Sequence, residues 1–354
     1  MNITILLPCT MERPVGGIKV ILEYANRFVS DGHDVKIIMP SQLMSIKNKL
    51  ASVVRFPYYM ISRNYFPYNW FPLDKKICCL YVKNLKYKYM PQNTDVFIAT
   101  AVETAYFLNS YDTQARKIYF IQDFEDWSMN KKQVLKSYGF HMEKIVISPW
   151  LKKLVESVGE KAYLIPNGFD FKKFYLKNSI EDRNNHKILM LYHKEERKRC
   201  KDAIKALRIV KKEIPDLSIS MFGVPKKPKF VPFDFNYYQK PNSELHNDLY
   251  NNAEIFIAAS RKEGMALPPA EAMQCGCAVC CTDIGGFAVY AKDNNTALLS
   301  PVYDYRSLAM NIIKLLQNEN ERIRIAMNGN KLIQEFTWDN AFEKFKKILF
   351  AGTL

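Results

Sequence analysis

Short apolar runs alternate with helical patterns along the first half of the chain. The run at 2–8 is followed by a loop, and then by a segment, 18–29, in which apolar residues recur every three or four positions. Further apolar runs stand at 34–39, 95–99, 117–122, 144–148 and 161–166. Because these runs are apolar throughout, both faces of each strand must be covered. The pattern predicts a doubly wound parallel α/β domain.

The same alternation begins again after the turn Pro166-Asn167-Gly168. Strands are expected at 187–192, 217–222, 254–258 and 278–282, and helices at 201–212, 244–251 and 270–274. A chain of 354 residues also exceeds what one hydrophobic core usually supports. We therefore predict two Rossmann-like domains facing across a cleft, at 1–167 and 168–335. An amphipathic helix within 336–354 is expected to return to the first domain.

The chain carries a net charge of +15, which attracts nucleic acid, anionic lipid or a phosphorylated ligand. The stretch 45–90 concentrates the excess and mixes Lys and Arg with Tyr, Phe and Trp. This mixture suits the headgroup region of an anionic bilayer. A solvated basic loop with a few core aromatics explains it equally well, and both interpretations stay open.

No run approaches the ~20 consecutive apolar residues that a membrane-spanning helix needs. The first eight residues lead directly into a strand pattern, without the basic and apolar regions of a signal peptide. We therefore expect a cytoplasmic protein. The basic stretch suggests, as an alternative, a peripheral position on the inner face of the cytoplasmic membrane.

Four of the eight cysteines, Cys275, Cys277, Cys280 and Cys281, stand close together. Zinc sites usually combine a Cys-x2-Cys pair with a distant second pair, and this spacing is too tight for four ligands. We expect small core residues in a reducing compartment and no metal.

Two glutamates, Glu263 and Glu271, lie eight positions apart at the expected start of a helix that follows a buried strand. Ligands of open α/β sheets bind at the carboxyl ends of the strands, and a helix N-terminus there attracts a diphosphate. A glutamate at this place can accept hydrogen bonds from paired sugar hydroxyls. The alternative is that both residues only cap and solvate the helix start.

The stretch Glu263-Gly-Met-Ala-Leu-Pro-Pro-Ala-Glu271-Ala-Met resembles the E-x7-E motif of the family 4 retaining glycosyltransferases. Here Met265 stands at the usual aromatic position, and Ala266 replaces the usual second glycine. The Gly-Gly loop, the Ile-Pro-Asn-Gly turn and the Phe-Thr-Trp start of the last helix also occur in family order. The resemblance covers essentially the whole chain and implies a GT-B fold, a nucleotide-sugar donor, and neither metal nor cofactor.

By this resemblance, 1–167 is the acceptor-side domain and 168–335 binds the nucleotide sugar. Glu263 would hold hydroxyls of the transferred sugar, and Glu271 would hold the ribose. The backbone of the segment between them would follow the donor, through Gly264, Met265, Ala266 and Leu267.

Members of this family also place an Arg and a Lys, five residues apart, on the diphosphate. Lys198 matches the lysine, but the arginine position falls on His193. Arg197 or Lys201 is expected to provide the second cation, because a leaving diphosphate without a metal ion needs two. A basic, solvated helix start is the alternative.

In the first domain, Gly16 and Gly17 permit close approach of the backbone to a phosphate or an acceptor, although a plain turn also explains them. Many members of the family carry a histidine after the strand at 117–122, facing the sugar, where this chain has Gln122-Asp123. Asp123, or Glu125 close by, is expected to take over this polar contact. The sequence of this stretch resembles that of rhamnosyltransferases of surface polysaccharides, and this resemblance implies dTDP-rhamnose as one donor.

The predicted catalytic residues are therefore Glu263, Lys198 and Asp123, in a retaining, metal-independent transfer to a glycan or lipid-linked acceptor. The absence of a clear carboxylate pair argues against double displacement, and the donor's own phosphate would help to remove the acceptor proton. His141, His186 and His246 lack a partner pattern, so we expect them at the surface.

Three other classes of protein share parts of this pattern. A nicotinamide dehydrogenase requires G-x-G-x-x-G after the first strand, which is missing. A nucleic-acid-binding protein would explain the charge, but no motif of that class is present, so we expect no nucleic-acid partner. A GT-B sugar-nucleotide epimerase is the nearest enzymatic alternative, and it should lack the pair formed by Glu263 and Glu271.

Overall fold

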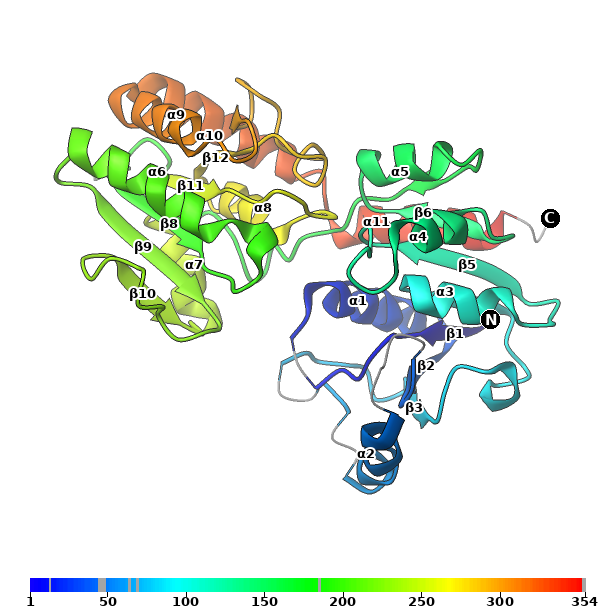
Figure 1. Cartoon of the computed structure of the whole chain (residues 1–354). Coiled ribbons are helices and arrows are strands. Elements are labelled where there is room, and N and C mark those ends of the chain that lie inside the picture. The colour runs from blue at the N-terminus through cyan, green and yellow to red at the C-terminus, as the bar shows by residue number, and fades with distance from the viewer. Residues whose placement is uncertain (13, 44–48, 63–64, 68–69, 184–185, 352–354) are drawn as a thin grey trace. The chain divides into compact units, whose positions relative to one another are not determined.

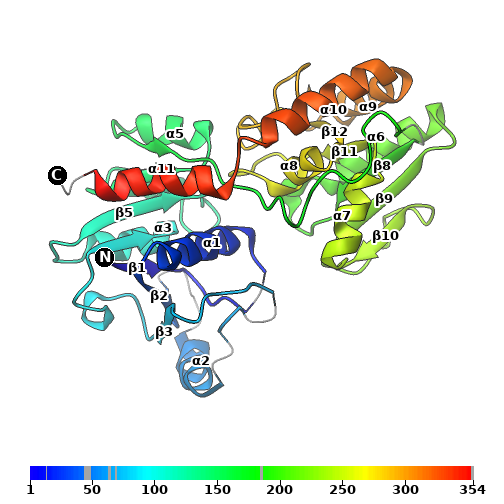
Figure 2. The ribbon, with the colours of Figure 1, turned by 180° about the vertical axis from the view of Figure 1, so that it is seen from behind.

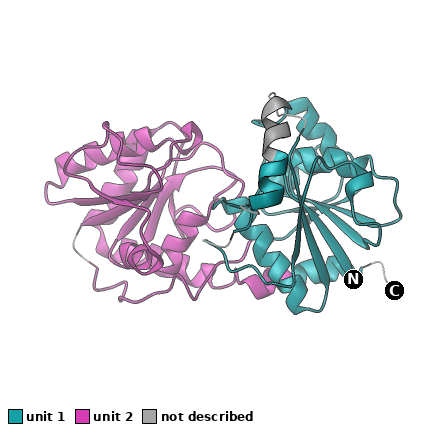
Figure 3. Cartoon of the chain, turned by 90° about the horizontal axis from the view of Figure 1, so that it is seen from below, with its two compact units in different colours: residues 1–165, 344–354 teal, residues 166–343 magenta. Residues whose placement is uncertain are grey.

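The computed structural model describes the chain except residues 13, 44–48, 63–64, 68–69, 184–185 and 352–354. The chain divides into two compact units, shown in Figure 3: unit 1 holds residues 1–165 and 344–354, and unit 2 holds residues 166–343. The sequence placed these boundaries at 167/168 and 335/336, within two and eight residues of the structural ones.

Unit 1 is built on a parallel sheet of seven strands in the described residues, in the order β3-β2-β1-β4-β5-β6-β7. The strands are β1 (Asn2–Leu6), β2 (Asp34–Pro40), β3 (Cys78–Val82), β4 (Val96–Ala99), β5 (Arg116–Ile121), β6 (Glu143–Val146) and β7 (Tyr163–Leu164). The helices between them are α1 (Gly16–Ser30), α2 (Lys49–Ser62), α3 (Val102–Asn109), α4 (Lys131–Tyr138) and α5 (Pro149–Glu156). Strands β2 and β3 are added on one side of β1, and β4 to β7 are added on its other side. This is the doubly wound pattern.

The C-terminal helix α11 (Trp338–Phe350) lies beside α1, as Figure 2 shows. The ring of Phe345 packs against Tyr24 and Phe28 at centroid distances of 5.1 and 5.3 Å. Arg116 donates to the carbonyl oxygen of Ile348 at 2.8 Å, so a carbonyl in the last turn of α11 has a donor partner from β5. These contacts attach the end of the chain to unit 1.

Unit 2 repeats the pattern with six strands in the described residues, in the order β10-β9-β8-β11-β12-β13. The strands are β8 (Lys187–Leu191), β9 (Ser218–Gly223), β10 (Asn236–Gln239), β11 (Ile255–Ala258), β12 (Ala278–Thr282) and β13 (Leu298–Ser300). The helices are α6 (Cys200–Glu213), α7 (Ser243–Asn251), α8 (Leu267–Gln274), α9 (Tyr305–Gln317) and α10 (Glu319–Ile333). The prediction of two Rossmann-like parallel domains is confirmed.

The four clustered cysteines lie in the core of unit 2, as predicted, and each is 0% exposed. Burial raises the pKa of the Cys277 thiol to about 12, and the pKa values of the other three thiols are also raised by burial. The Cys275 thiol donates to Asn247 Oδ1 at 3.2 Å. They therefore act as small, protonated core residues.

Residues 45–90 are not one continuous surface segment in the described part. Tyr65, Phe71 and Tyr81 are buried, and Tyr65 stacks on Tyr81 at 5.7 Å between ring centroids. The end of α2, in contrast, exposes Ile61 to 85%. Three aromatics of this stretch thus belong to the core of unit 1, whereas Tyr58 and Tyr89 are exposed, and the described lysines of the stretch face solvent.

Within the residues that the structure describes, no helix is long and apolar enough to cross a membrane.

Candidate functional site

The candidate site of unit 2 lies where its sheet changes direction. Strands β8, β9 and β10 extend the sheet to one side, and the chain then returns to add β11 on the other side of β8. The loops that follow β8 and β11 therefore diverge from neighbouring strand ends, which leaves a crevice at the carboxyl edge. Both the basic segment 193–199 and the segment 259–266 leave the sheet at this point.

The loop from β11 to α8 holds Glu263 in a nearly buried position, with 5% of its surface exposed. A Cβ atom on Gly286 would stand 2.3 Å from the carbonyl oxygen of Glu263, so only glycine allows this close approach. The Tyr290 hydroxyl donates to the carbonyl of Ala266 at 2.6 Å. The Met265 sulfur accepts from the backbone N–H of Asn167 at 3.3 Å. The loop is thus fixed along its length by partners in unit 2.

The segment after β8 reaches the same place through a tight turn. The 3-10 helix η2 (Glu196–Lys198) is followed by Arg199 in the left-handed region, at φ 49°, which redirects the chain into α6. The N–H of Arg261 donates to the carbonyl of Arg197 at 2.8 Å and joins this turn to the β11–α8 loop. Arg199 itself pairs with Asp202, Nη2 to Oδ2 at 2.6 Å.

Two cations converge on the carboxylate of Glu263. Lys198 Nζ lies 2.7 Å from Oε1, and Arg197 Nη1 lies 3.1 Å from Oε2. Arg197 also contacts Glu195, Nε to Oε2 at 2.5 Å, and the carbonyl of Lys262 at 3.3 Å. A carboxylate that is almost completely buried requires such pairing, because burying a charge alone is unfavourable by several kcal/mol. The structure brings Arg197, Lys198 and Glu263 together, and their assignment to a donor-binding site stays a prediction.

A hollow of about 360 Å³ opens beside this cluster. Lys198 and Glu263 line it on the polar side, and the ends of β8 and β11 with Pro268 and Phe287 form its apolar wall. An apolar wall with a few convergent polar groups is a feature of small-molecule sites.

Lys201 and His193 differ from Arg197 in their placement. Lys201 is exposed, and its ammonium lies over the ring of Phe230 at 5.5 Å. His193 is half-buried, and its Nδ1 accepts from the N–H of Glu195 at 3.1 Å. Burial is the main cause that lowers the pKa of His193, with Lys198 and Arg197 contributing and Glu195 opposing. Of the two cations expected to replace the family arginine, Arg197 is the one that reaches the cluster.

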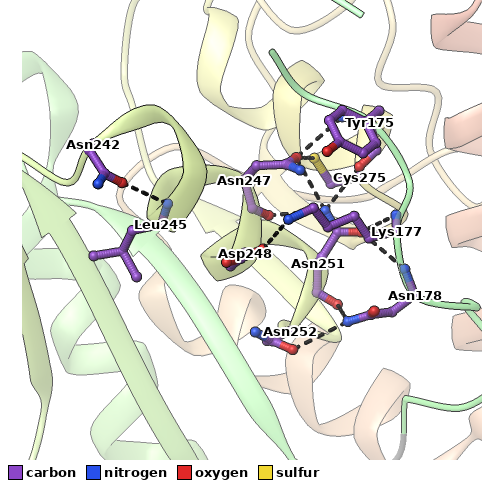
Figure 4. Close-up of polar contacts among 10 residues, drawn as sticks. All are labelled: Tyr175, Lys177, Asn178, Asn242, Leu245, Asn247, Asp248, Asn251, Asn252 and Cys275. Carbon is purple, nitrogen blue, oxygen red and sulfur yellow. Dashed lines mark hydrogen bonds and ion pairs between the residues drawn. The ribbon is translucent and has the colours of Figure 1, made fainter. Parts of the chain in front are cut away.

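Glu271 projects from the middle of α8 and is half-buried. It accepts from the hydroxyl of the fully buried Tyr250, on α7, at 3.2 Å. Helix α7 is held in turn by an asparagine network, drawn in Figure 4. Asn247 and Asn251 bind the backbone of Tyr175 and Lys177, and Asn251 also binds Asn247; all four residues belong to unit 2. The network fixes α7 and hence the partner of Glu271.

The start of α8 offers fewer backbone donors than most helices. Ala266 is the N-cap and forms no side-chain cap, and Leu267 is the first helical residue. The next two residues, Pro268 and Pro269, have no N–H group. An anion at this helix start would therefore depend on the amides between Gly264 and Leu267 and on the two cations.

The candidate residues of unit 1 lie at the carboxyl edge of its own sheet. Gly16 and Gly17 open α1, and a Cβ atom on Gly17 would meet the Gln122 side chain at 3.4 Å. Asp123 accepts from the N–H of Phe124 at 2.8 Å. Glu125 accepts from the N–H of Val102, at the start of α3, at 2.7 Å. These assignments stay predictions.

Burial raises the pKa of Glu125 to about 8, with Asp123 and Glu103 adding to the rise and the Val102 hydrogen bond opposing it. The sequence offered Asp123 and Glu125 as alternatives for the polar contact that a histidine makes in the family. The proximity of Glu125 to the start of α3 depends on tertiary structure and has no local signature.

The prediction for His246 was wrong. Its ring stacks on Tyr250 at 5.0 Å and lies 4.3 Å from the ring of Phe222, and its Nε2 is buried. Burial lowers its pKa to about 3. His141 is exposed, and His186 pairs with Asp216 at 2.8 Å.

Comparisons with known proteins agree with this geometry. Residues 171–332 match the family model of the glycosyl transferases group 1. The matched segment contains both motif glutamates and the converging cations. The GT-B fold expected from the resemblance is confirmed by a solved structure of Anabaena HepE in complex with UDP and glucose. That structure has a TM-score of 0.74 and 14% identity, and the match covers 99% of this chain and 100% of that one.

Two curated relatives match shorter segments. The poly(glycerol-phosphate) alpha-glucosyltransferase of Bacillus subtilis is 24% identical over 151 residues, which cover 40% of this chain and 22% of the relative. The capsular polysaccharide biosynthesis glycosyltransferase CapM of Staphylococcus aureus is 23% identical over 183 residues, which cover 48% of each chain. The aligned parts therefore span less than half the length of these relatives.

Proposed function

We propose that this protein is a glycosyltransferase that moves a sugar from a nucleotide-diphosphate sugar to a glycan or lipid-linked acceptor. The observation that carries the proposal is the convergence of Lys198 and Arg197 on Glu263 beside the hollow at the switch point of unit 2. The match of 171–332 to glycosyl transferases group 1 supports the same activity. An epimerase is less well supported, because both motif glutamates are present at the sheet edge.

The cation pair supplies the charge that a leaving diphosphate requires. In the ligand-free arrangement, Lys198 and Arg197 neutralise the carboxylate of Glu263. A bound diphosphate offers the same cations a more highly charged partner, and it frees Glu263 to accept hydrogen bonds from sugar hydroxyls. On donor binding, the two cations exchange Glu263 for the diphosphate, and hydrogen bonds from the sugar hydroxyls replace the ion pairs at Glu263.

Leaving-group stabilisation by two cations needs no metal ion, and we propose a metal-independent, retaining transfer of the family 4 type. A diphosphate held by positioned cations stabilises the charge that develops as the glycosidic bond breaks. The freed phosphate oxygen would accept the proton of the acceptor hydroxyl on the same face of the sugar. Positioning and electrostatics would then provide the rate enhancement.

Glu271 is proposed to accept the ribose hydroxyls, and the backbone from Gly264 to Leu267 to follow the donor. The hydroxyl of Tyr250 donates to one carboxylate oxygen of Glu271, Oε2, and thereby fixes its orientation. The expected contributions of Gly16, Gly17 and Asp123 in unit 1 complete the proposal.

The relatives point to polymers of the cell surface as the class of acceptor. One is named for poly(glycerol-phosphate) and another for capsular polysaccharide biosynthesis. Acceptors of such pathways are lipid-linked or surface glycans, and we propose that the exposed lysines of the stretch 45–90 hold the enzyme against an anionic membrane surface.

The test is a thermal-shift screen across UDP-, GDP- and dTDP-sugars, dTDP-rhamnose included. A ligand at 100 times its dissociation constant adds about 2.7 kcal/mol of stability. We expect one nucleotide class to raise Tm, with the same shift in EDTA. No shift with any nucleotide sugar would contradict the proposed function, while a shift that disappears with EDTA and returns with magnesium would contradict only its metal independence.

A further inference from the structure

The turn that follows β8 contains a carboxylate that a diphosphate-binding site would be expected to exclude. Glu195 lies two residues before Arg197, and its side chain is 51% exposed. A negative charge so close to a bound diphosphate would repel it. The contacts of Glu195 explain why the chain nevertheless places a glutamate here.

The side chain of Glu195 fixes the orientation of Arg197. Its Oε2 lies 2.5 Å from Nε of Arg197, on the side of the guanidinium away from Nη1. Nη1 then reaches Glu263 at 3.1 Å and the carbonyl of Lys262 at 3.3 Å. An arginine side chain that is 28% exposed has many rotamers, and a partner on Nε reduces them to those that face the site.

The backbone of Glu195 fixes His193 at the same time. Its N–H donates to Nδ1 of His193 at 3.1 Å, so Nδ1 acts as an acceptor and carries no proton. The ring hydrogen of the neutral imidazole is then on Nε2. His193 is half-buried, and Arg197 provides the positive charge that reaches Glu263.

We propose that Glu195 is a positioning residue: it aims Arg197 at the bound diphosphate as the second cation beside Lys198. This inference rests on the proposed function. It explains how the site provides two cations although His193 stands where the family resemblance implies an arginine.

The neighbouring Glu196 provides a matched control. It belongs to the same turn, its side chain is 80% exposed, and it contacts Arg199 at 3.5 Å instead of Arg197. Removing either glutamate takes away one negative charge near the site. Long-range electrostatics alone therefore predicts that both Glu195→Ala and Glu196→Ala bind a diphosphate slightly more tightly.

The experiment is titration calorimetry of UDP, GDP and dTDP into the full-length protein and its variants. We expect Glu195→Ala to weaken binding about tenfold, which corresponds to ~1.4 kcal/mol, and Glu196→Ala not to weaken it. Glu195→Gln keeps an acceptor for Arg197, so its affinity should lie between those of the wild type and Glu195→Ala. In an Arg197→Ala background, Glu195→Ala should not weaken binding further, because Glu195 acts through Arg197.

The outcomes separate the two proposals. If the wild type binds one of these nucleotides and Glu195→Ala binds it as well as Glu196→Ala does, the positioning role is refuted and the proposed function stands. Additive effects of Glu195→Ala and Arg197→Ala would refute it as well. If the wild type binds none of them, the proposed function fails and the positioning role falls with it. Thermal unfolding of each variant verifies that the fold persists.

Discussion

The ammonium of Lys198 lies 2.7 Å from Oε1 of Glu263, and that carboxylate is only 5% exposed. The two residues are 65 positions apart, and they meet because the loops after β8 and β11 leave neighbouring strands at the switch point. A buried ion pair of this kind does little for stability. Its place beside a hollow of about 360 Å³ is better explained by the exchange of partners on donor binding.

The first prediction concerns Glu263→Gln. The amide keeps the shape of the side chain but removes the charge that holds Lys198 and Arg197 in the absence of ligand. We expect the affinity for the nucleoside diphosphate to rise by up to about tenfold, or ~1.4 kcal/mol. Transfer of the sugar should fall at the same time, because a contact to its hydroxyls is weakened. Calorimetry and a product assay measure the two effects.

Glu196→Gln is the control for this variant, since it removes one negative charge from an exposed position nearby. It should change affinity far less than Glu263→Gln does. Weaker nucleotide binding by Glu263→Gln would show that the carboxylate supports the cations and does not compete for them.

The second prediction separates a ribose contact from a structural one. Glu271→Ala should weaken nucleotide binding, but it also removes the acceptor of the buried Tyr250 hydroxyl. Leaving a buried donor unpaired is unfavourable by about 1–3 kcal/mol, so a lower Tm is expected too. Tyr250→Phe removes that hydroxyl and leaves Glu271 in place. It should keep nucleotide affinity, and equal losses of affinity in both variants would argue against the ribose role.

Much of the fold was predictable because parallel strands and amphipathic helices have strong local patterns. The strands β1, β8 and β11 are continuous apolar runs, and each was placed within two residues. The short strand β13 (Leu298–Ser300) and the exposed strand β10 (Asn236–Gln239) were missed, because three or four residues without an apolar run carry little signal.

The site was predictable only in part. Glu263 and Lys198 were found from their motif positions, but the motif does not reveal that they contact each other. The role of Gly286 depends on a close approach to Glu263 in space. His246 likewise packs against Phe222 of β9 and against Phe174, which are distant in the sequence, so a surface position was the wrong expectation. Such contacts between distant segments leave no periodicity in the sequence.

The third prediction follows from His246. Burial lowers its pKa to about 3, so the folded state favours the neutral ring and the unfolded state takes up a proton first as the pH falls. The stabilisation is complete above about pH 6.5 and is lost progressively as the pH falls toward 3, by roughly 2 kcal/mol at pH 5. His246→Phe should reduce this acid sensitivity of Tm. His141→Gln, at an exposed position, should leave it unchanged, and identical pH profiles of wild type and His246→Phe would contradict the prediction.

The last prediction concerns the membrane. Lys83, Lys86 and Lys88 are exposed near the end of β3, and the neighbouring ring of Tyr89 is exposed as well, so this segment can meet a lipid surface. Each basic residue near an anionic surface contributes about 1 kcal/mol, so replacing all three by Gln should reduce cosedimentation with anionic vesicles strongly. High salt should do the same by screening.

The matched control replaces the exposed lysines Lys131, Lys132 and Lys136 of α4, in the same unit and with the same change of charge. Equal losses in both triple variants would mean that binding depends on net charge alone, and a wild type that ignores anionic vesicles at low salt would leave these lysines as a solvated face.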